Sequence, residues 1–193
     1  MVNSDIEVFL NRYISLPQKI TDLFGELIEY VEFSPNDFLV KAGEFSSEFF
    51  IIKSGIVRSY FLTQEGKEIT RAFFTPGYIT GASSAIMKGI PSELNYQSLT
   101  PVTAYKGNLI KLKELTLEHH ELAMFYIKTL EDAYLKAEAI VLEIASSNAE
   151  ERYINLKERI PNIDNIIAQK YIASYLNVTT VQLSRIRKKM YSR

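Results

Sequence analysis

The chain has 193 residues and a formal net charge of −1, and 47% of its residues are hydrophobic, which is enough for one or two packed domains. It contains no cysteine, and this excludes disulfides, cysteine-ligated zinc or iron–sulfur centres and a cysteine nucleophile. No signal peptide is recognisable and no apolar run approaches the roughly 20 residues that span a bilayer, so we expect a cytoplasmic protein without membrane contact.

Two short amphipathic helices are predicted first, over residues 5–14 and 18–27. From residue 28 to about 106 the pattern changes to short runs of aromatic and β-branched residues, which Gly or Pro punctuates. Gly66 gives the clearest hairpin signal. This rhythm predicts a small antiparallel barrel or roll.

A long helix is predicted over about residues 117–145, which contain neither Pro nor Gly. Read in sevens, it has a seam of small and apolar residues that suits a close helix pair, formed by Ala123, Tyr126, Leu130, Ala133, Ala137, Ile140 and Ile144. A flanking row of Ile127, Tyr134 and Val141 could pack back on the roll and leave the seam for a second copy. An ordinary buried helix without a partner chain is the alternative.

The four residues from Ser147 to Glu150 have the form of a capping box that starts a further helix. They predict two domains, covering residues 1–145 and 146–193.

The charge is unevenly distributed between these two parts. Of the 22 basic and 23 acidic residues in the chain, six basic and no acidic ones lie in residues 166–193, so 16 and 23 remain upstream. A basic tip on an acidic body is where a polyanion would bind.

Within this tip, the apolar spacing fits two short helices joined by a tight turn, as in a helix-turn-helix. Asn177 can take the left-handed conformation at the end of the first helix, and Thr179 or Thr180 can cap the second. The residues expected to face base edges are Thr180, Val181, Gln182, Ser184 and Arg185. Those expected at phosphates are Lys170, Arg187, Lys188 and Lys189. A solvated helical hairpin that binds no DNA is the alternative.

The order of roll, long helix, capped helix and terminal helix-turn-helix resembles the Crp/Fnr family of bacterial transcription regulators. The segment QKYIASYLNVTTVQLSRIRKKM resembles the family's DNA-binding segment, and IIKSGIVRSYFLTQEGKEITRAFFTPGYITG resembles its cyclic-nucleotide-binding fold. The resemblance implies an α+β protein with a jelly-roll-like antiparallel β-roll, a long dimerisation helix and an all-α DNA-binding domain. Several members carry a wing after the helix-turn-helix, and none is expected before Arg193.

The effector pocket that the resemblance implies departs from the family. Nucleotide-binding members place a Glu and, further on, an Arg there to hold the ribose and the cyclic phosphate. This chain has Ala82 and then Glu93 without an Arg, so we predict no binding of cyclic AMP or cyclic GMP in the family's manner. The candidate pocket residues are Thr80, Gly81, Ala82, Ser83, Ser84, Ser92 and Glu93.

These patterns predict a homodimeric, sequence-specific DNA-binding transcription regulator that recognises a palindromic operator. RNA polymerase is a further candidate partner, and the roll would bind an unknown small molecule or serve only as a dimer platform. No cofactor or metal is expected, because His119 and His120 are adjacent on a helix and make a poor chelate. A ligand-sensing or protein-interaction module with a degenerate DNA-binding domain is the alternative, and no catalytic constellation rises above chance.

Overall fold

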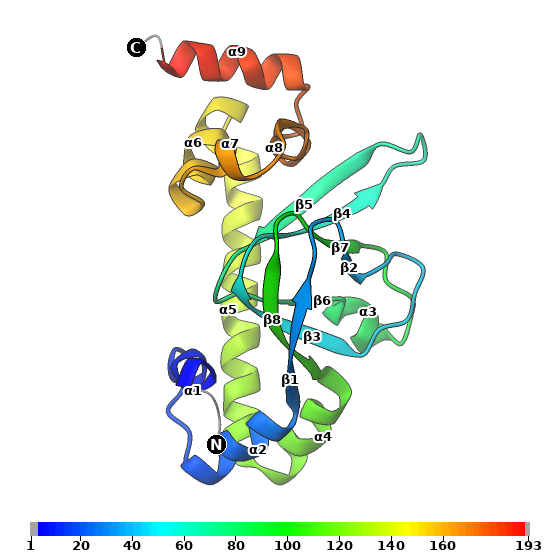
Figure 1. Ribbon diagram of the computed structural model, residues 1–193, viewed down its shortest axis with the longest axis vertical. Coiled ribbons are helices and arrows are strands. Elements are labelled where there is room, and N and C mark those ends of the chain that lie inside the picture. The colour runs from blue at the N-terminus through cyan, green and yellow to red at the C-terminus, as the bar shows by residue number, and fades with distance from the viewer. Residues whose placement is uncertain (1–3, 192–193) are drawn as a thin grey trace.

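Short alternating segments in the first half of the chain build two four-stranded antiparallel sheets, which form a roll (Figure 1). The computed structural model describes residues 4–191. The strand orders are β1-β8-β3-β6 and β2-β7-β4-β5. The strands are β1 (Ile28–Phe33), β2 (Phe38–Val40), β3 (Glu48–Ser54), β4 (Val57–Leu62), β5 (Glu68–Phe74), β6 (Ile79–Gly81), β7 (Asn95–Ser98) and β8 (Val102–Asn108). The predicted hairpin is confirmed, since Gly66 has φ 78° in the turn between β4 and β5.

Two N-terminal helices, α1 (Ser4–Asn11) and α2 (Gln18–Glu26), cover one end of the roll. Their apolar faces bury Phe9 and Phe24 in a cluster that also contains Phe49 of β3 and Phe125 of the long helix. The rings of Phe24 and Phe125 meet edge to face, with centroids 5.3 Å apart. This aromatic cluster joins the N-terminus, the roll and the long helix.

The long helix begins later than predicted. Helix α4 (Leu109–Glu118) ends at His119, whose backbone is extended, and α5 (His120–Ser146) follows. Leu109 and Leu122 are both buried in the same cluster. Because thirteen positions correspond to about 140° around a continuous helix, these two side chains would point away from each other if α4 and α5 were one helix. The break at His119 lets both reach the core.

Four short helices follow α5, namely α6 (Ala149–Arg159), α7 (Ile163–Ile166), α8 (Gln169–Leu176) and α9 (Thr180–Tyr191). The predicted capping box is displaced by one residue. Asn148 is the N-cap of α6, and its side chain accepts from the N–H groups of Glu150 and Glu151, while Glu151 Oε2 accepts from the Asn148 N–H at 2.9 Å. Helix α5 continues through Ser146 with Ser147 as its C-cap, and α6 begins one residue later than predicted.

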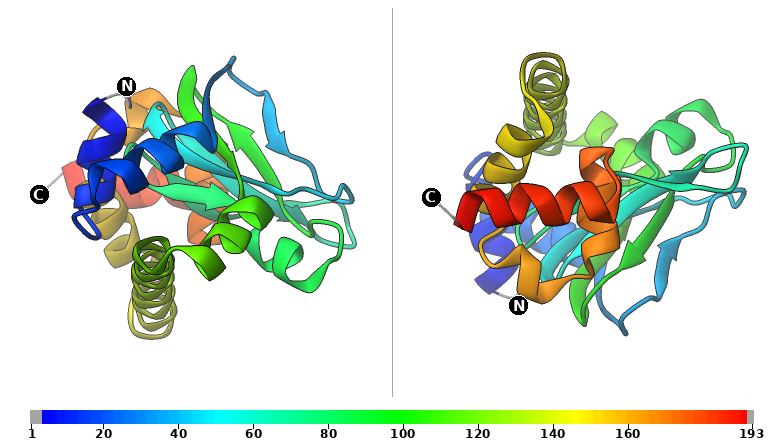
Figure 2. Two further views of the ribbon diagram at one scale, coloured as in Figure 1. Left: turned by 90° about the horizontal axis from the view of Figure 1, so that it is seen from below. Right: turned by 90° about the horizontal axis from the view of Figure 1, so that it is seen from above.

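The C-terminal helices and the roll share one hydrophobic core. Ile56 and Phe73 of the roll lie in the same buried cluster as Tyr153 of α6, Ile172 of α8 and Leu183 of α9. Views along the long axis place α9 across one end of the molecule, with α5 standing to the side of the roll (Figure 2). The position of α9 therefore depends on contacts with the roll as well as on the chain connection.

Candidate nucleic-acid interface

The connection between α8 and α9 has helix-turn-helix geometry, and the predicted turn is confirmed. Asn177 takes the left-handed conformation, with φ 55° and ψ 43°. Its N–H donates to Ser174 O at 3.2 Å, and the Val178 N–H donates to Ala173 O at 3.0 Å, which together close the C-terminus of α8. Behind the turn, Leu183 of α9 is fully buried in the same cluster as Ala173.

A reciprocal capping box starts α9. Thr179 Oγ1 accepts from the Gln182 N–H at 3.1 Å, and Gln182 Oε1 accepts from the Thr179 N–H at 2.8 Å. Of the two predicted caps, the structure therefore selects Thr179. The Thr-x-x-Gln spacing was visible in the sequence and could have predicted this second role for Gln182. To pair bidentately with adenine, the Gln182 amide would have to leave the capping box.

The residues predicted to read bases lie together on the outer side of α9. Thr179, Thr180, Val181, Gln182, Ser184 and Arg185 are all exposed. Val181 is the apolar member of this group and is 59% exposed at the N-terminus of α9. Helix α9 forms one end of the molecule, and none of the other helices and strands described within residues 4–191 covers its outer side (Figure 1).

The four cations predicted to contact phosphates differ in their exposure and in the acids that lie near them. Lys170 and Lys188 are exposed. Arg187 Nε lies 3.8 Å from Asp164 Oδ1 with its side chain 23% exposed, and Lys189 Nζ lies 2.6 Å from Glu150 Oε2. Acids from α6 and α7 therefore offset part of the positive charge, which a count along residues 166–193 could not detect.

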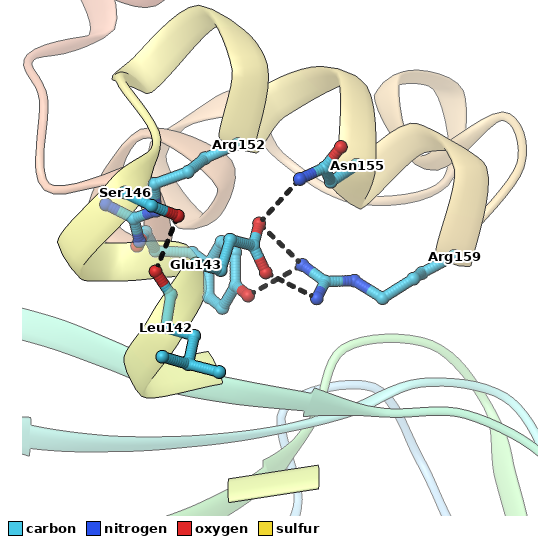
Figure 3. Close-up of polar contacts among 7 residues, drawn as sticks. Leu142, Glu143, Ser146, Arg152, Asn155 and Arg159 are labelled. Atoms are coloured by element: carbon cyan, nitrogen blue, oxygen red, sulfur yellow. Dashed lines mark hydrogen bonds and ion pairs between the residues drawn. The ribbon is translucent and has the colours of Figure 1, made fainter. Parts of the chain in front are cut away.

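Polar contacts hold α6 and α8 against the end of α5 (Figure 3). Glu143 Oε2 accepts from Arg159 Nη1 at 2.7 Å, and Glu143 Oε1 accepts from Asn155 Nδ2 at 3.5 Å. Arg159 also donates to the Tyr175 hydroxyl at 2.9 Å, and burial raises the pKa of Tyr175. Arg152 Nη2 donates to Tyr175 O at 3.1 Å, so an arginine from α6 satisfies a carbonyl at the C-terminus of α8.

Helix α8 is also docked on β5, the edge strand of its sheet. Ser174 Oγ accepts from the Thr70 N–H at 2.9 Å and donates to Glu68 O at 2.8 Å. The ring of Tyr175 lies 5.2 Å from that of Phe73. One serine thus satisfies a donor and an acceptor that the open edge of a sheet would otherwise leave to water.

A buried arginine, Arg58, also stabilises the packing of α8 on the roll. The Arg58 side chain of β4 is 2% exposed, and its guanidinium lies between the rings of Tyr60 and Tyr171, 3.9 and 4.1 Å from their centroids. Its Nε and Nη2 donate to Gln97 Oε1 at 3.1 and 2.8 Å, and Nη1 lies 2.7 Å from Glu68 Oε2. Because Tyr171 belongs to α8, this cation–π sandwich fixes the helix-turn-helix on the roll. Sequence reasoning missed Arg58, and its only signal was a lone cation between apolar strand residues.

The residues predicted to line an effector pocket lie at the end of β6, at the start of α3 (Ser83–Lys88) and in the loop after α3. Ala82, at the position of the family's Glu, is 2% exposed and packs in the core of the roll. Ser92 Oγ donates to Leu94 O at 2.7 Å within its own loop, and Glu93 is exposed. Of the remaining positions, Thr80 and Gly81 are buried, Ser83 is half-buried and Ser84 is exposed.

Two cavities lie between the roll and the C-terminal helices. One of about 190 Å³ is lined by residues of the β4–β5 hairpin, α8 and the start of α9, among them Lys67, Lys170 and Thr180. The other, of about 430 Å³, lies among Ile56, Thr100 and Arg159. The boundary between the roll and the C-terminal helices therefore contains two open cavities.

The predicted dimer seam runs along a largely uncovered face of α5. Leu130 and Ile144 are 42% and 56% exposed. Ala133 and Ala137 are also exposed, and Ala123, Tyr126 and Ile140 are half-buried.

The flanking row does not pack on the roll, and that prediction is wrong. Ile127, Tyr134 and Val141 are 45%, 67% and 64% exposed. After the buried Leu122 and Phe125, the side of α5 that is turned to the rest of the chain makes polar contacts: Asp132 accepts from the Tyr13 hydroxyl at 3.3 Å, and Lys136 lies over the ring of Tyr78 at 4.3 Å. The apolar face available to a partner is therefore wider than the predicted seam.

Residues 4–191 contain neither a membrane-spanning helix nor a cluster of metal ligands. No helix there is long and apolar enough to cross a membrane. These residues also contain no group of three or more His, Cys, Asp or Glu side chains that could hold a metal ion.

Comparisons with known proteins identify the architecture. Residues 30–119 match the family model of the cyclic nucleotide-binding domain. A protein from Eubacterium rectale described as a transcriptional regulator of the Crp/Fnr family is 16% identical, with a TM-score of 0.75 over 96% of this chain and 88% of that one. FixK2 from Bradyrhizobium japonicum is 19% identical, with a TM-score of 0.70 over 86% and 85% of the two chains.

The c-di-GMP-responsive global regulator CLP of Xanthomonas campestris is 12% identical, with a TM-score of 0.63 over 91% of this chain and 92% of that one. No curated protein shows a significant sequence match. Residues 30–119 are therefore similar to the cyclic nucleotide-binding domain, and the chain as a whole has the fold of these solved structures.

Proposed function

We propose that this protein is a homodimeric transcription regulator that binds a palindromic DNA operator through α9. The observation that carries the proposal is the exposed outer side of α9, where Val181 and Arg185 lie beside hydroxyl groups in a stretch that contains no acid. A major groove accepts a helix of this size, and arginine, threonine and valine side chains can all contact base edges. The fold shared with Crp/Fnr regulators supports a regulatory role over a catalytic one.

The arrangement of α5 and α9 suits a two-fold dimer. The apolar face of α5 is turned away from the roll, and α9 lies at one end of the molecule (Figure 2). A two-fold axis parallel to α5 on that side would carry both copies of α9 to the same end. Two recognition helices would then enter successive major grooves about 34 Å apart, which requires a palindromic site.

Domain roles follow from this arrangement. Residues 1–145 would form the sensor and dimerisation part, and residues 146–193 the DNA-binding part. Thr180, Val181, Gln182, Ser184 and Arg185 would read bases, whereas Lys170, Arg187, Lys188 and Lys189 would bind phosphates. Arg187 and Lys189 would first have to leave Asp164 and Glu150, with which they pair.

Selection of bound sequences from a random DNA pool tests the proposal most directly. We expect an enriched palindrome and an affinity that falls steeply with salt. Replacing Arg185 by Ala should lower discrimination by about 1–3 kcal/mol, whereas Lys188→Ala should weaken all sequences alike. If no sequence is enriched and binding is negligible at low salt, the protein is instead a ligand-sensing or protein-interaction module.

We further propose that the roll does not bind cyclic AMP or cyclic GMP in the manner of the family. The support is chemical: buried Ala82 offers no carboxylate to a ribose, and the loop with Ser92 and exposed Glu93 offers no cation to a phosphate. Calorimetric titration with either nucleotide should give no heat of binding at micromolar concentrations. Binding at micromolar or tighter affinity would contradict this part of the proposal.

A further inference from the structure

Cations from two separate parts of the fold meet at the 190 Å³ cavity beside α9. Lys67 belongs to the hairpin between β4 and β5, whereas Lys170 and Thr180 begin the two helices of the helix-turn-helix, and all three line this cavity. Lys67 and Lys170 are exposed. The hairpin rises from the roll alongside α8 toward the level of α9 (Figure 1). A positive surface therefore continues from the helix-turn-helix onto the roll.

The relative position of the hairpin and α8 is fixed by specific contacts. Ser174 bonds to the backbone of Thr70 and Glu68, immediately after Lys67 in β5. The Arg58 sandwich with Tyr171 lies beside these bonds. Because these contacts join the start of β5 to α8, Lys67 is held next to α8 rather than carried on an independent lobe.

The charge balance at the cavity favours an anion. Glu68 also lines it, but its carboxylate lies 2.7 Å from Nη1 of Arg58, which neutralises it. Glu65 is on the same turn, and its hydrogen bond from Thr63 lowers its pKa, so it stays ionised, but it does not line the cavity. Two lysines and a threonine hydroxyl remain to meet a ligand that approaches α9.

We propose that Lys67 of the roll binds a backbone phosphate of the DNA whose major groove α9 enters, so that the DNA-binding surface includes the sensor domain. This inference rests on the proposed DNA-binding function. A phosphate is the fitting group because lysine meets it as a point charge, and the phosphates that border a groove lie where both helices of a helix-turn-helix begin.

The test compares Lys67→Gln with Lys113→Gln in the full-length dimer on the selected operator. Lys113 is an exposed lysine on α4, at the opposite end of the molecule, so both variants lose the same charge. Each lost phosphate contact should reduce the slope of log affinity against log salt by about 0.9, and the dimer loses one contact in each subunit, so the slope should fall by about 1.8. Relative to wild type, the Lys67 variant should therefore lose about 12-fold less affinity between 50 and 200 mM salt, whereas the Lys113 variant should keep the wild-type slope.

A second measurement identifies the phosphate. Operators with a single neutral methylphosphonate are assayed at each position flanking the groove with wild-type protein and with Lys67→Gln. One position in each half-site should weaken wild-type binding and have no effect on the variant. If the variant keeps the wild-type slope and every methylphosphonate affects both proteins alike, the inference is wrong while the proposed function stands. If wild type binds no DNA, the proposed function itself fails.

Discussion

The cation–π contact between Arg58 and Tyr171 allows a quantitative test of how the helix-turn-helix is fixed to the roll. The Arg58 side chain is 2% exposed and its guanidinium lies 4.1 Å from the Tyr171 ring centroid, so water screens the contact little. Desolvated cation–π pairs contribute about 2 kcal/mol, and exposed ones about 0.5–1 kcal/mol. Because Tyr171 is half-buried, we expect a coupling energy of about 1–2 kcal/mol.

A double-mutant cycle with Arg58→Met, Tyr171→Leu and the double variant isolates this coupling, with urea denaturation as the assay. Arg58→Met alone should cost about 1.5–3 kcal/mol, since Gln97 loses its charged donors. It should not cost the 3–5 kcal/mol of a broken buried ion pair, because Glu68 is 43% exposed and regains water.

The exposed pair of Lys41 and Phe38, with Nζ 5.6 Å from the ring centroid, is the matched control. Its cycle of Lys41→Met and Phe38→Leu should give about 0.5 kcal/mol. If the Arg58–Tyr171 coupling is no larger than that of the control, the sandwich does not fix α8 on the roll and the argument fails.

Three further predictions concern single side chains. Thr179→Ala removes the cap of α9 and should lower the free energy of unfolding by about 1 kcal/mol in urea denaturation. Tyr153→Phe removes a hydroxyl that donates to Asp164 at 2.6 Å, and should cost about 1–2 kcal/mol in the same assay. Burial, followed by Asp132, raises the pKa of Tyr13 from 10 to about 12. The folded state thus holds this proton after the unfolded state has lost it, so the associated stability is complete below pH 10 and disappears toward pH 12. In an alkaline titration of the folded protein followed by phenolate absorbance, Tyr13→Phe should show one fewer tyrosine that titrates near pH 12 than wild type.

The two predictions measured by urea denaturation each have a control variant. Thr180→Ala changes the neighbouring threonine, which does not accept the capping bond, and should be nearly neutral. Tyr134→Phe removes a hydroxyl from a residue that is 67% exposed and should leave the denaturation midpoint unchanged. Equal midpoints for Thr179→Ala and Thr180→Ala, or for the two tyrosine variants, would contradict the corresponding prediction. An unchanged alkaline titration in Tyr13→Phe would contradict the third.

Features set by neighbouring residues could be predicted from the sequence. The turn at Asn177 was predictable because few residues other than glycine tolerate the left-handed conformation. The position of the capping box before α6 was not, since Ser147 and Asn148 are both suitable caps with a Glu three residues later. The choice depends on where α5 ends, and that depends on packing beyond the local sequence.

Features set by distant contacts could not be predicted. The heptad pattern of α5 identified an apolar face, but a repeat alone does not say which side of a helix meets the roll, so the placement of Tyr134 was wrong. The only local signal of Arg58 is a lone cation between apolar strand residues, and this does not reveal its partner. Its role arises because α8, more than 100 residues further along the chain, places Tyr171 on the outer face of β4.

The docking of α8 on β5 also has a consequence for solubility. An unprotected outer strand, here EITRAFF, is a template on which another chain can add a strand and begin aggregation. Ser174 occupies a donor and an acceptor of that strand, so the helix-turn-helix shields the roll from unwanted pairing. Variants that detach α8 should precipitate on prolonged incubation at high concentration.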